Sequence, residues 1–184
     1  MWTTSVDDRV FIRQVVYDII AYVASEEIDE FEVLVARYFA NPTPPTPRSL
    51  RGGVPARLSS GRPCISEVAP AILVAVLSFM MLELEEASQR APIEGLKAGL
   101  KGMIWRGAGR SGAGMWIRAA TKALPEQLTM IIYCATMPIG LTITTASVRK
   151  IAYRTAQIYG LSEDQCVALS HAVLDRLCRN VTES

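Results

Sequence analysis

Residues 68–82 form the stretch that most limits how this chain can fold, because all 15 of them are uncharged and most are apolar. They lie between Glu67 and Glu83. A membrane-spanning helix needs about 20 apolar residues, with roughly 17 as a lower limit, so the run is short for a span. A helix that is apolar on every face must be surrounded by other elements. The sequence therefore predicts a central buried helix, with Pro70 in its first turn.

A second uncharged run, residues 128–148, contains 21 residues and is a transmembrane candidate on length alone. Pro138 and Gly140 interrupt it, and several threonines make it less apolar. We expect a helix over residues 126–137, a tight connection, and a new helix capped within residues 144–147, where threonine and serine cluster. No strand is predicted anywhere in the chain.

The two ends of the chain show clear helical periodicity. In residues 6–40 apolar side chains recur every three to four positions, which predicts a helical hairpin or one bent helix that starts after Ser5 and ends before Pro42. Near the other end, Gly160 is expected to terminate one helix, and Ser162 with Gln165 forms a capping box that opens the last helix.

These features predict an all-α fold, a helical bundle of roughly six to eight helices with a central apolar helix. We expect three parts: an acidic N-terminal helical hairpin over residues 1–40, a basic Pro/Gly-rich linker or loop over residues 41–66, and the main helical bundle over residues 67–184. The middle part is assigned as a linker because six prolines and three glycines within it oppose both helix and central strand.

Charge is balanced overall but unevenly distributed. The formal net charge is +1, which gives no reason to expect nucleic acid as a partner. Residues 1–40 carry eight acidic side chains against three arginines, whereas residues 94–123 carry six basic side chains against Glu94. The acidic front and the basic middle either attract each other or face different partners.

The basic middle also holds the residues that we expect to make intermolecular contacts. Small residues four apart let two helix backbones approach closely, and tryptophans among basic residues are typical of a helix at a membrane surface. A basic helix pair docked on the acidic N-terminal hairpin, with its tryptophans in the core, is favoured over a helix at a membrane surface. The interaction candidates are Gly95, Gly99, Gly102, Trp105, Arg106, Arg110 and Trp116.

No catalytic, cofactor-binding or metal-binding residues are predicted. Residues 107–112 match the G-x-G-x-x-G pattern, but no strand precedes them, so a loop between helices is favoured over a phosphate site. His171 is the only histidine, and a single helix that also carries Asp175 and Cys178 offers no oxyanion hole or substrate cleft. The ligand pairs of zinc sites are also missing from the sequence.

The sequence thus favours a non-enzymatic interaction or regulatory protein that works through helix–helix contacts with a protein partner or with itself as a homo-oligomer. The alternative is a membrane-acting helical effector that inserts its apolar segments within residues 68–148 into an anionic membrane. An apolar fraction of 50% and a mean hydropathy of +0.23 agree with both hypotheses. Four widely spaced cysteines and no signal-like N-terminus favour a cytoplasmic location, with membrane association under the alternative.

Overall fold

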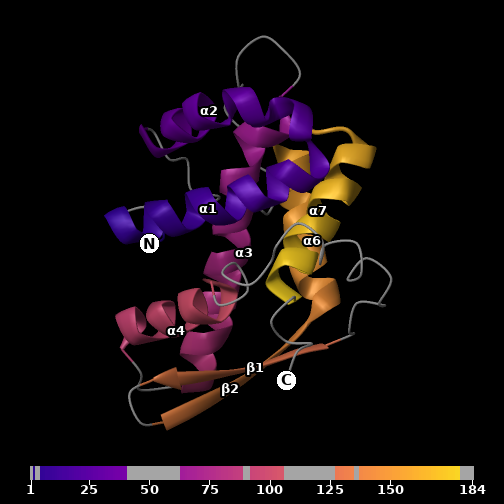
Figure 1. Cartoon of the computed structure of the whole chain (residues 1–184). Helices are drawn as coiled ribbons and strands as arrows, with labels where there is room; N and C mark the ends of the chain where they lie inside the picture. The colour runs from indigo at the N-terminus through magenta and orange to yellow at the C-terminus, as the bar shows by residue number, and fades with distance from the viewer. Residues whose placement is uncertain are drawn as a thin grey trace, which may run out of the picture.

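The computed structural model describes Trp2 and residues 5–40, 63–88, 92–105, 127–134 and 137–178. Within these residues it is a bundle of six α-helices around a central apolar helix, with one two-stranded sheet at its end (Figure 1), which confirms the predicted helical bundle. The elements, in chain order, are α1 (Val6–Val23), η1 (Ser25–Glu27), α2 (Ile28–Ala40), α3 (Ile65–Ser88), α4 (Ile93–Trp105), β1 (Gln127–Cys134), β2 (Met137–Thr144), α6 (Thr145–Ile158) and α7 (Glu163–Cys178).

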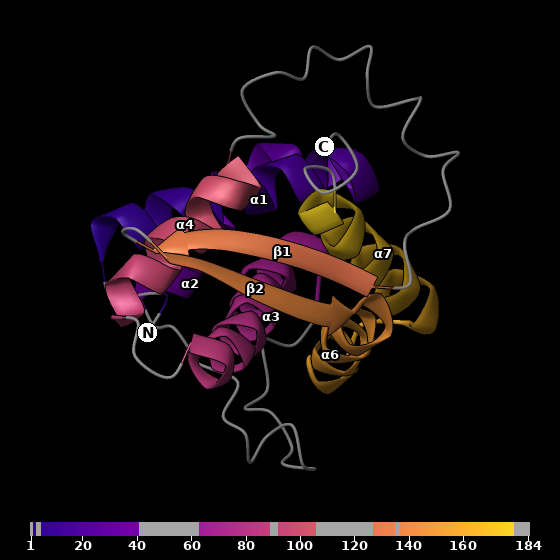
Figure 2. The same cartoon turned by 90° about the horizontal axis from the view of Figure 1, so that it is seen from below.

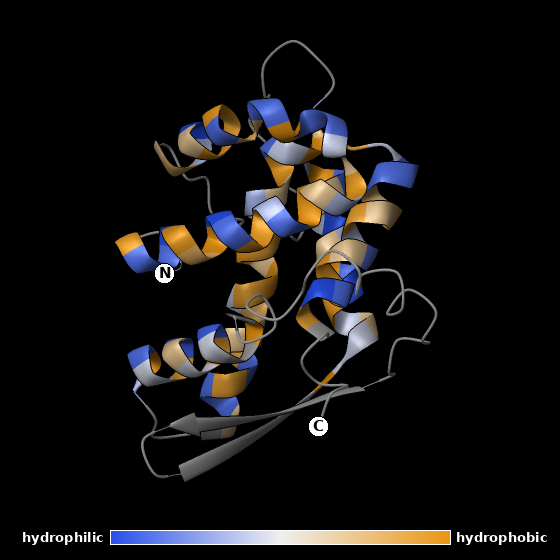
Figure 3. Ribbon diagram, in the orientation of Figure 1, coloured by the Kyte–Doolittle hydropathy of each residue, from blue (hydrophilic) through white to orange (hydrophobic). Residues whose placement is uncertain are grey.

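Helix α3 is the centre of the bundle, as its uncharged sequence predicts. Figure 1 shows it running through the molecule, with α1 and α2 across one half, α4 and the sheet at the other end, and α6 and α7 along one side. Apolar residues dominate α3, and hydrophilic and apolar residues are mixed along the helices that cover it (Figure 3). Among its side chains, Ile72, Leu77 and Leu84 have no exposed surface. One contiguous core therefore joins the helices from both ends of the chain.

Helix α3 starts earlier than its apolar run suggests, and this corrects the expected place of Pro70. The helix begins at Ile65, so Pro70 lies inside it rather than in its first turn. A proline there cannot donate a hydrogen bond to the carbonyl of Ser66. The earlier start depends on Glu27, in the turn between α1 and α2, because its carboxylate accepts hydrogen bonds from the first amides of α3.

The predicted helix ends are confirmed where the signal is local. Ser5 caps α1 by accepting a hydrogen bond from the Asp8 amide at 3.0 Å, and Thr144 caps α6 by accepting one from Ser147. Gly160 follows α6 with a φ of 82°, the left-handed conformation that glycine adopts most easily. The capping box of α7 forms in both directions between Ser162 and Gln165.

The helix predicted over residues 126–137 is wrong, because β1 and β2 form an antiparallel hairpin there. Residues 135 and 136 lie outside the described part. The register pairs Leu128 with Ile143 and Met130 with Leu141, so apolar positions stand opposite apolar positions. Ile143 is buried while its neighbours Thr142 and Thr144 are exposed, which is the two-residue period of a half-buried strand. Strand geometry also tolerates Pro138 and Gly140, because a two-stranded sheet has only edge strands.

The N-terminal helices pack on the rest of the bundle. α1 and α2 contact each other, both contact α3, and α1 also contacts α7. The division into segments 1–40, 41–66 and 67–184 stays a prediction, and residues 41–62 lie outside the described residues. Seen from below, the β-hairpin of β1 and β2 lies across the end of the bundle, next to α3 and α4 (Figure 2).

Candidate functional site

The predicted interaction residues divide between helix α4 and a part that the structure does not describe. Gly95, Gly99, Gly102 and Trp105 are on α4, whereas Arg106, Arg110 and Trp116 lie outside the described residues, as does the glycine-rich motif 107–112. Gly95 and Gly99 are half-buried. A Cβ atom added at Gly102 would meet no atom within 4 Å, so at this position the small residue serves no close helix approach within the described chain.

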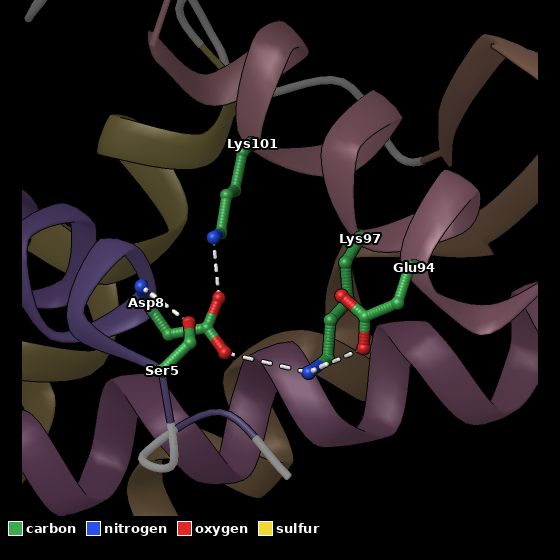
Figure 4. A network of polar contacts seen from close by, with 5 residues as sticks. All are labelled: Ser5, Asp8, Glu94, Lys97 and Lys101. Carbon is green, nitrogen blue, oxygen red and sulfur yellow. Dashed lines mark hydrogen bonds and ion pairs between the residues drawn. The ribbon is translucent and has the colours of Figure 1, made fainter.

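The acidic front and the basic middle do attract each other, at a buried ion-pair cluster between α1 and α4 (Figure 4). Asp8, on the first turn of α1, is only 2% exposed. Its carboxylate forms ion pairs with Lys97, at 3.3 Å from Nζ to Oδ2, and with Lys101. Glu94 adds a weaker contact to Lys97 from the solvent side, at 3.6 Å. Helix α4 is therefore linked to α1 through the buried charge of Asp8.

The positions of the two lysines follow from helix geometry. Lys97 and Lys101 are four residues apart, so both reach the same side of α4 and meet one carboxylate. Lys97 is 5% exposed, and its ammonium lies 5.7 Å from the centre of the Trp2 ring, which adds a cation–π contact. The buried charges are thus paired with one another, as charged groups must be when they are removed from water.

The electrostatics of Asp8 reflect this pairing. Burial alone would raise its pKa, but the hydrogen bonds from Lys101 and Ser5 and the charges of both lysines outweigh burial and hold the pKa below its ordinary value. Asp8 is therefore ionised at neutral pH. A carboxylate whose oxygens are occupied by two lysines serves as a link between helices rather than as a general base.

A second buried charge holds the other end of α4. Arg176 of α7 is 3% exposed, and its Nε donates to Asp18 Oδ2 of α1 at 3.1 Å. Its Nη1 donates to the backbone carbonyl of Ile104 at 3.1 Å. That carbonyl belongs to the last turn of α4, where no further helical amide is available to it, and a cation is favourable there.

Glu27 is a third functional carboxylate that sequence reasoning missed. It lies in the turn between α1 and α2, yet its two oxygens accept hydrogen bonds from the backbone amides of Ile65 and Ser66, at 3.3 and 2.7 Å. These are otherwise unpaired amides at the start of α3. Glu27 thus fixes the start of the central helix, which explains why α3 begins before its apolar run.

The exposed apolar side chains are unevenly distributed over the surface. Val6, Val10 and Tyr17 of α1 are 76%, 54% and 40% exposed. Their spacings of four and seven residues place them along one side of the helix, opposite the buried side that includes Ile12 and Val16. We call these three residues the outer stripe of α1.

The chemistry that could support catalysis is sparse in the described residues. No group of three or more histidine, cysteine or acidic side chains there could hold a metal ion. His171 is exposed on α7. The free thiols Cys64 and Cys166 have raised pKa values, chiefly because burial disfavours the thiolate.

Helix α3 is the one described helix that is long and apolar enough to cross a membrane. The stretch that meets this criterion is Ile65–Ala87, with a mean hydropathy of 2.1 over an 18-residue window that is 78% buried inside the protein. The central helix of a soluble bundle satisfies the same criterion.

Comparisons with known proteins identify no relative of the chain. No protein-family model matches it, and neither the curated proteins nor the solved structures give a significant match. Functional inference therefore depends on the contacts described above.

Proposed function

We propose that this protein is a non-enzymatic interaction or regulatory protein that acts through helix–helix contacts and associates with a second copy of itself. The observation that carries the proposal is the outer stripe of α1, formed by Val6, Val10 and Tyr17. It extends over 12 residues, or about 16 Å of helix between the first and the last, on the side opposite the buried side chains of α1. Burying one such side chain favours association by about 1.5–3 kcal/mol.

A second copy is the proposed occupant because the charges beside the stripe complement one another. Helical spacing places Arg9 and Arg13 on one flank of the stripe and Asp7 on the other, while Asp18 is engaged by Arg176 and Arg13 also pairs with Glu32. In a parallel pair related by a twofold axis, the acidic flank of one helix faces the basic flank of its partner. An antiparallel pair would place like charges together, so we propose a parallel arrangement of the two α1 helices.

The test is the oligomeric state of the full chain by sedimentation velocity over a range of concentrations. We expect the unmodified protein to form a dimer and Val10→Glu to remain monomeric, because a carboxylate in the contact would be buried beside apolar side chains. The matched control is Val167→Glu on α7, which alters a valine of comparable exposure, 44%, away from the stripe. A wild-type protein that is monomeric at every concentration, or two variants that behave alike, would contradict the proposal.

A membrane-acting effector is the second candidate, and helix α3 is the observation that favours it. A helix of 24 residues is about 36 Å long, which exceeds the hydrocarbon core of a bilayer at roughly 30 Å. In this hypothesis the charged helices around α3 cover it in water and separate from it at a membrane.

We propose a cytoplasmic location, with which the free thiols Cys64 and Cys166 agree, and membrane association only under the second candidate. A protein partner or a second copy is favoured over nucleic acid, because Lys97 and Lys101 of α4 are already paired with Asp8.

A further inference from the structure

Helix α4 is fastened to the bundle at two points by buried charges, and we propose that these points form a latch. In the closed state Asp8 holds Lys97 and Lys101, while Asp18 positions Arg176 on the carbonyl of Ile104. In the open state α4 leaves its place over α3 without unfolding the rest of the bundle. The latch is a conformational switch that goes beyond the proposed self-association and does not depend on it.

Helix α4 has an apolar side that the latch keeps covered. Leu96, Leu100 and Ile104 recur every four residues and have no exposed surface. Opening would bring these side chains and the neighbouring part of α3 into contact with water. The closed and open states therefore differ in exposed apolar area, and this makes the open state attractive to an apolar partner.

The two fastening points lie in the same order on α1 and on α4. Asp8 and Asp18 are ten residues apart on α1, or about 15 Å along the helix. The earlier carboxylate serves the middle of α4 and the later one serves its last turn, so the order of contacts along α1 matches the order along α4 (Figure 4 shows the first of them). Helix α1 is thus linked to the middle of α4 directly through Asp8, and to its last turn through Arg176 of α7.

The charges of the latch depend on one another. Inside a protein an ion pair holds strongly only while both charges are present, because loss of one leaves the other buried and unpaired. Neutralising either Asp8 or the lysines therefore converts an attraction into a penalty. This gives the latch two discrete states rather than a gradual loosening.

Hydrogen exchange measured by mass spectrometry on the full chain tests the latch. Asp8→Asn keeps the size of the side chain and removes its charge, and we expect about tenfold or faster amide exchange in peptides covering residues 93–105. Peptides covering residues 145–158 of α6 should keep their wild-type rates. The matched control is Glu32→Gln, which removes the exposed ion pair between Arg13 of α1 and Glu32 of α2 and should leave α4 unchanged.

Two outcomes would overturn the proposal. Unchanged exchange of α4 in Asp8→Asn would show that the charges do not hold the helix. Faster exchange spread equally over all helices would show that Asp8 supports the whole fold and that no separate latch exists. If Asp8→Asn does not fold, Lys101→Met provides the same test, because Lys101 is partly exposed and its apolar stem is retained.

Discussion

Asp8 illustrates how one residue acquires its role from a distant partner. By sequence it is the third residue of a helix that starts after Ser5, a position where any acid is favourable. In the fold it is buried, and its lysine partner at position 97 is 89 residues away. The charge imbalance between the two segments predicts the attraction, but periodicity cannot tell which of the eight N-terminal acids carries it.

The loss of stability at acid pH should depend on Asp8. Because its pKa is lowered below the ordinary value of 3.8, its contribution to folding is fully present above about pH 4 and is lost as the pH falls through the lowered pKa. We expect Asp8→Asn to reduce the free energy of unfolding at pH 7 by about 1.4 kcal/mol, the equivalent of the tenfold faster exchange of α4, and to flatten its decline below pH 4. Urea titrations at pH 7 and pH 3 measure both effects.

The exposed pair Arg13–Glu32 provides the comparison for this prediction. Both side chains are more than half exposed, so Glu32→Gln should change the free energy of unfolding at pH 7 by less than about 1 kcal/mol. Equal losses in Asp8→Asn and Glu32→Gln would mean that burial adds nothing to the strength of the ion pair.

At the level of elements, the sequence predicts what local rules determine. Ser5, Gly160 and the Ser162–Gln165 box act on amides and carbonyls a few residues away, so their helix ends could be located in advance. The β-hairpin could not be predicted, because the uncharged run at 128–148 has a composition that fits both a helix and a buried strand. The pairing between strands that decides between them is not a local property. The start of α3 escaped prediction for a similar reason, since its cap comes from Glu27, 38 residues earlier.

The candidate site was even less accessible to prediction. Gly102 was predicted from small-residue spacing as an intermolecular contact, and this stays a prediction, because its surroundings within the described chain are open. Arg176, by contrast, has no motif around it, and it becomes important only because α7 places it between Asp18 and the end of α4. Motif spacing reports contacts within one helix, whereas these contacts join three helices.

Removing the cap of α3 should destabilise the central helix. Glu27→Ala leaves the amides of Ile65 and Ser66 without their carboxylate, and we expect the free energy of unfolding to fall by about 1–2 kcal/mol. Glu26→Ala is the matched control, because Glu26 lies in the same turn, is exposed, and makes no contact with α3 among the described interactions. Guanidinium unfolding followed by circular dichroism compares the two, and equal losses would argue against the cap.

For the whole molecule, the central question is whether α3 stays covered. Because most of its apolar window is buried, we expect the wild-type chain neither to sediment with liposomes, anionic or neutral, nor to release an enclosed dye. Binding with leakage would instead favour the membrane-acting candidate. In that case Trp105→Ala combined with Trp116→Ala should reduce binding, and undiminished binding would exclude both tryptophans from the mechanism.

The contact between Asp18 and Arg176 also sets an order of events during synthesis. The two residues are 158 positions apart, and a ribosome that adds about 5–20 residues per second needs roughly 10–30 s to cover that distance. From the time α3 is complete until α7 is made, α1 and α3 exist without α7, so the apolar side chains that α7 covers stay exposed. The nascent chain is therefore expected to need a chaperone, or to fold only after α7 leaves the ribosomal exit tunnel.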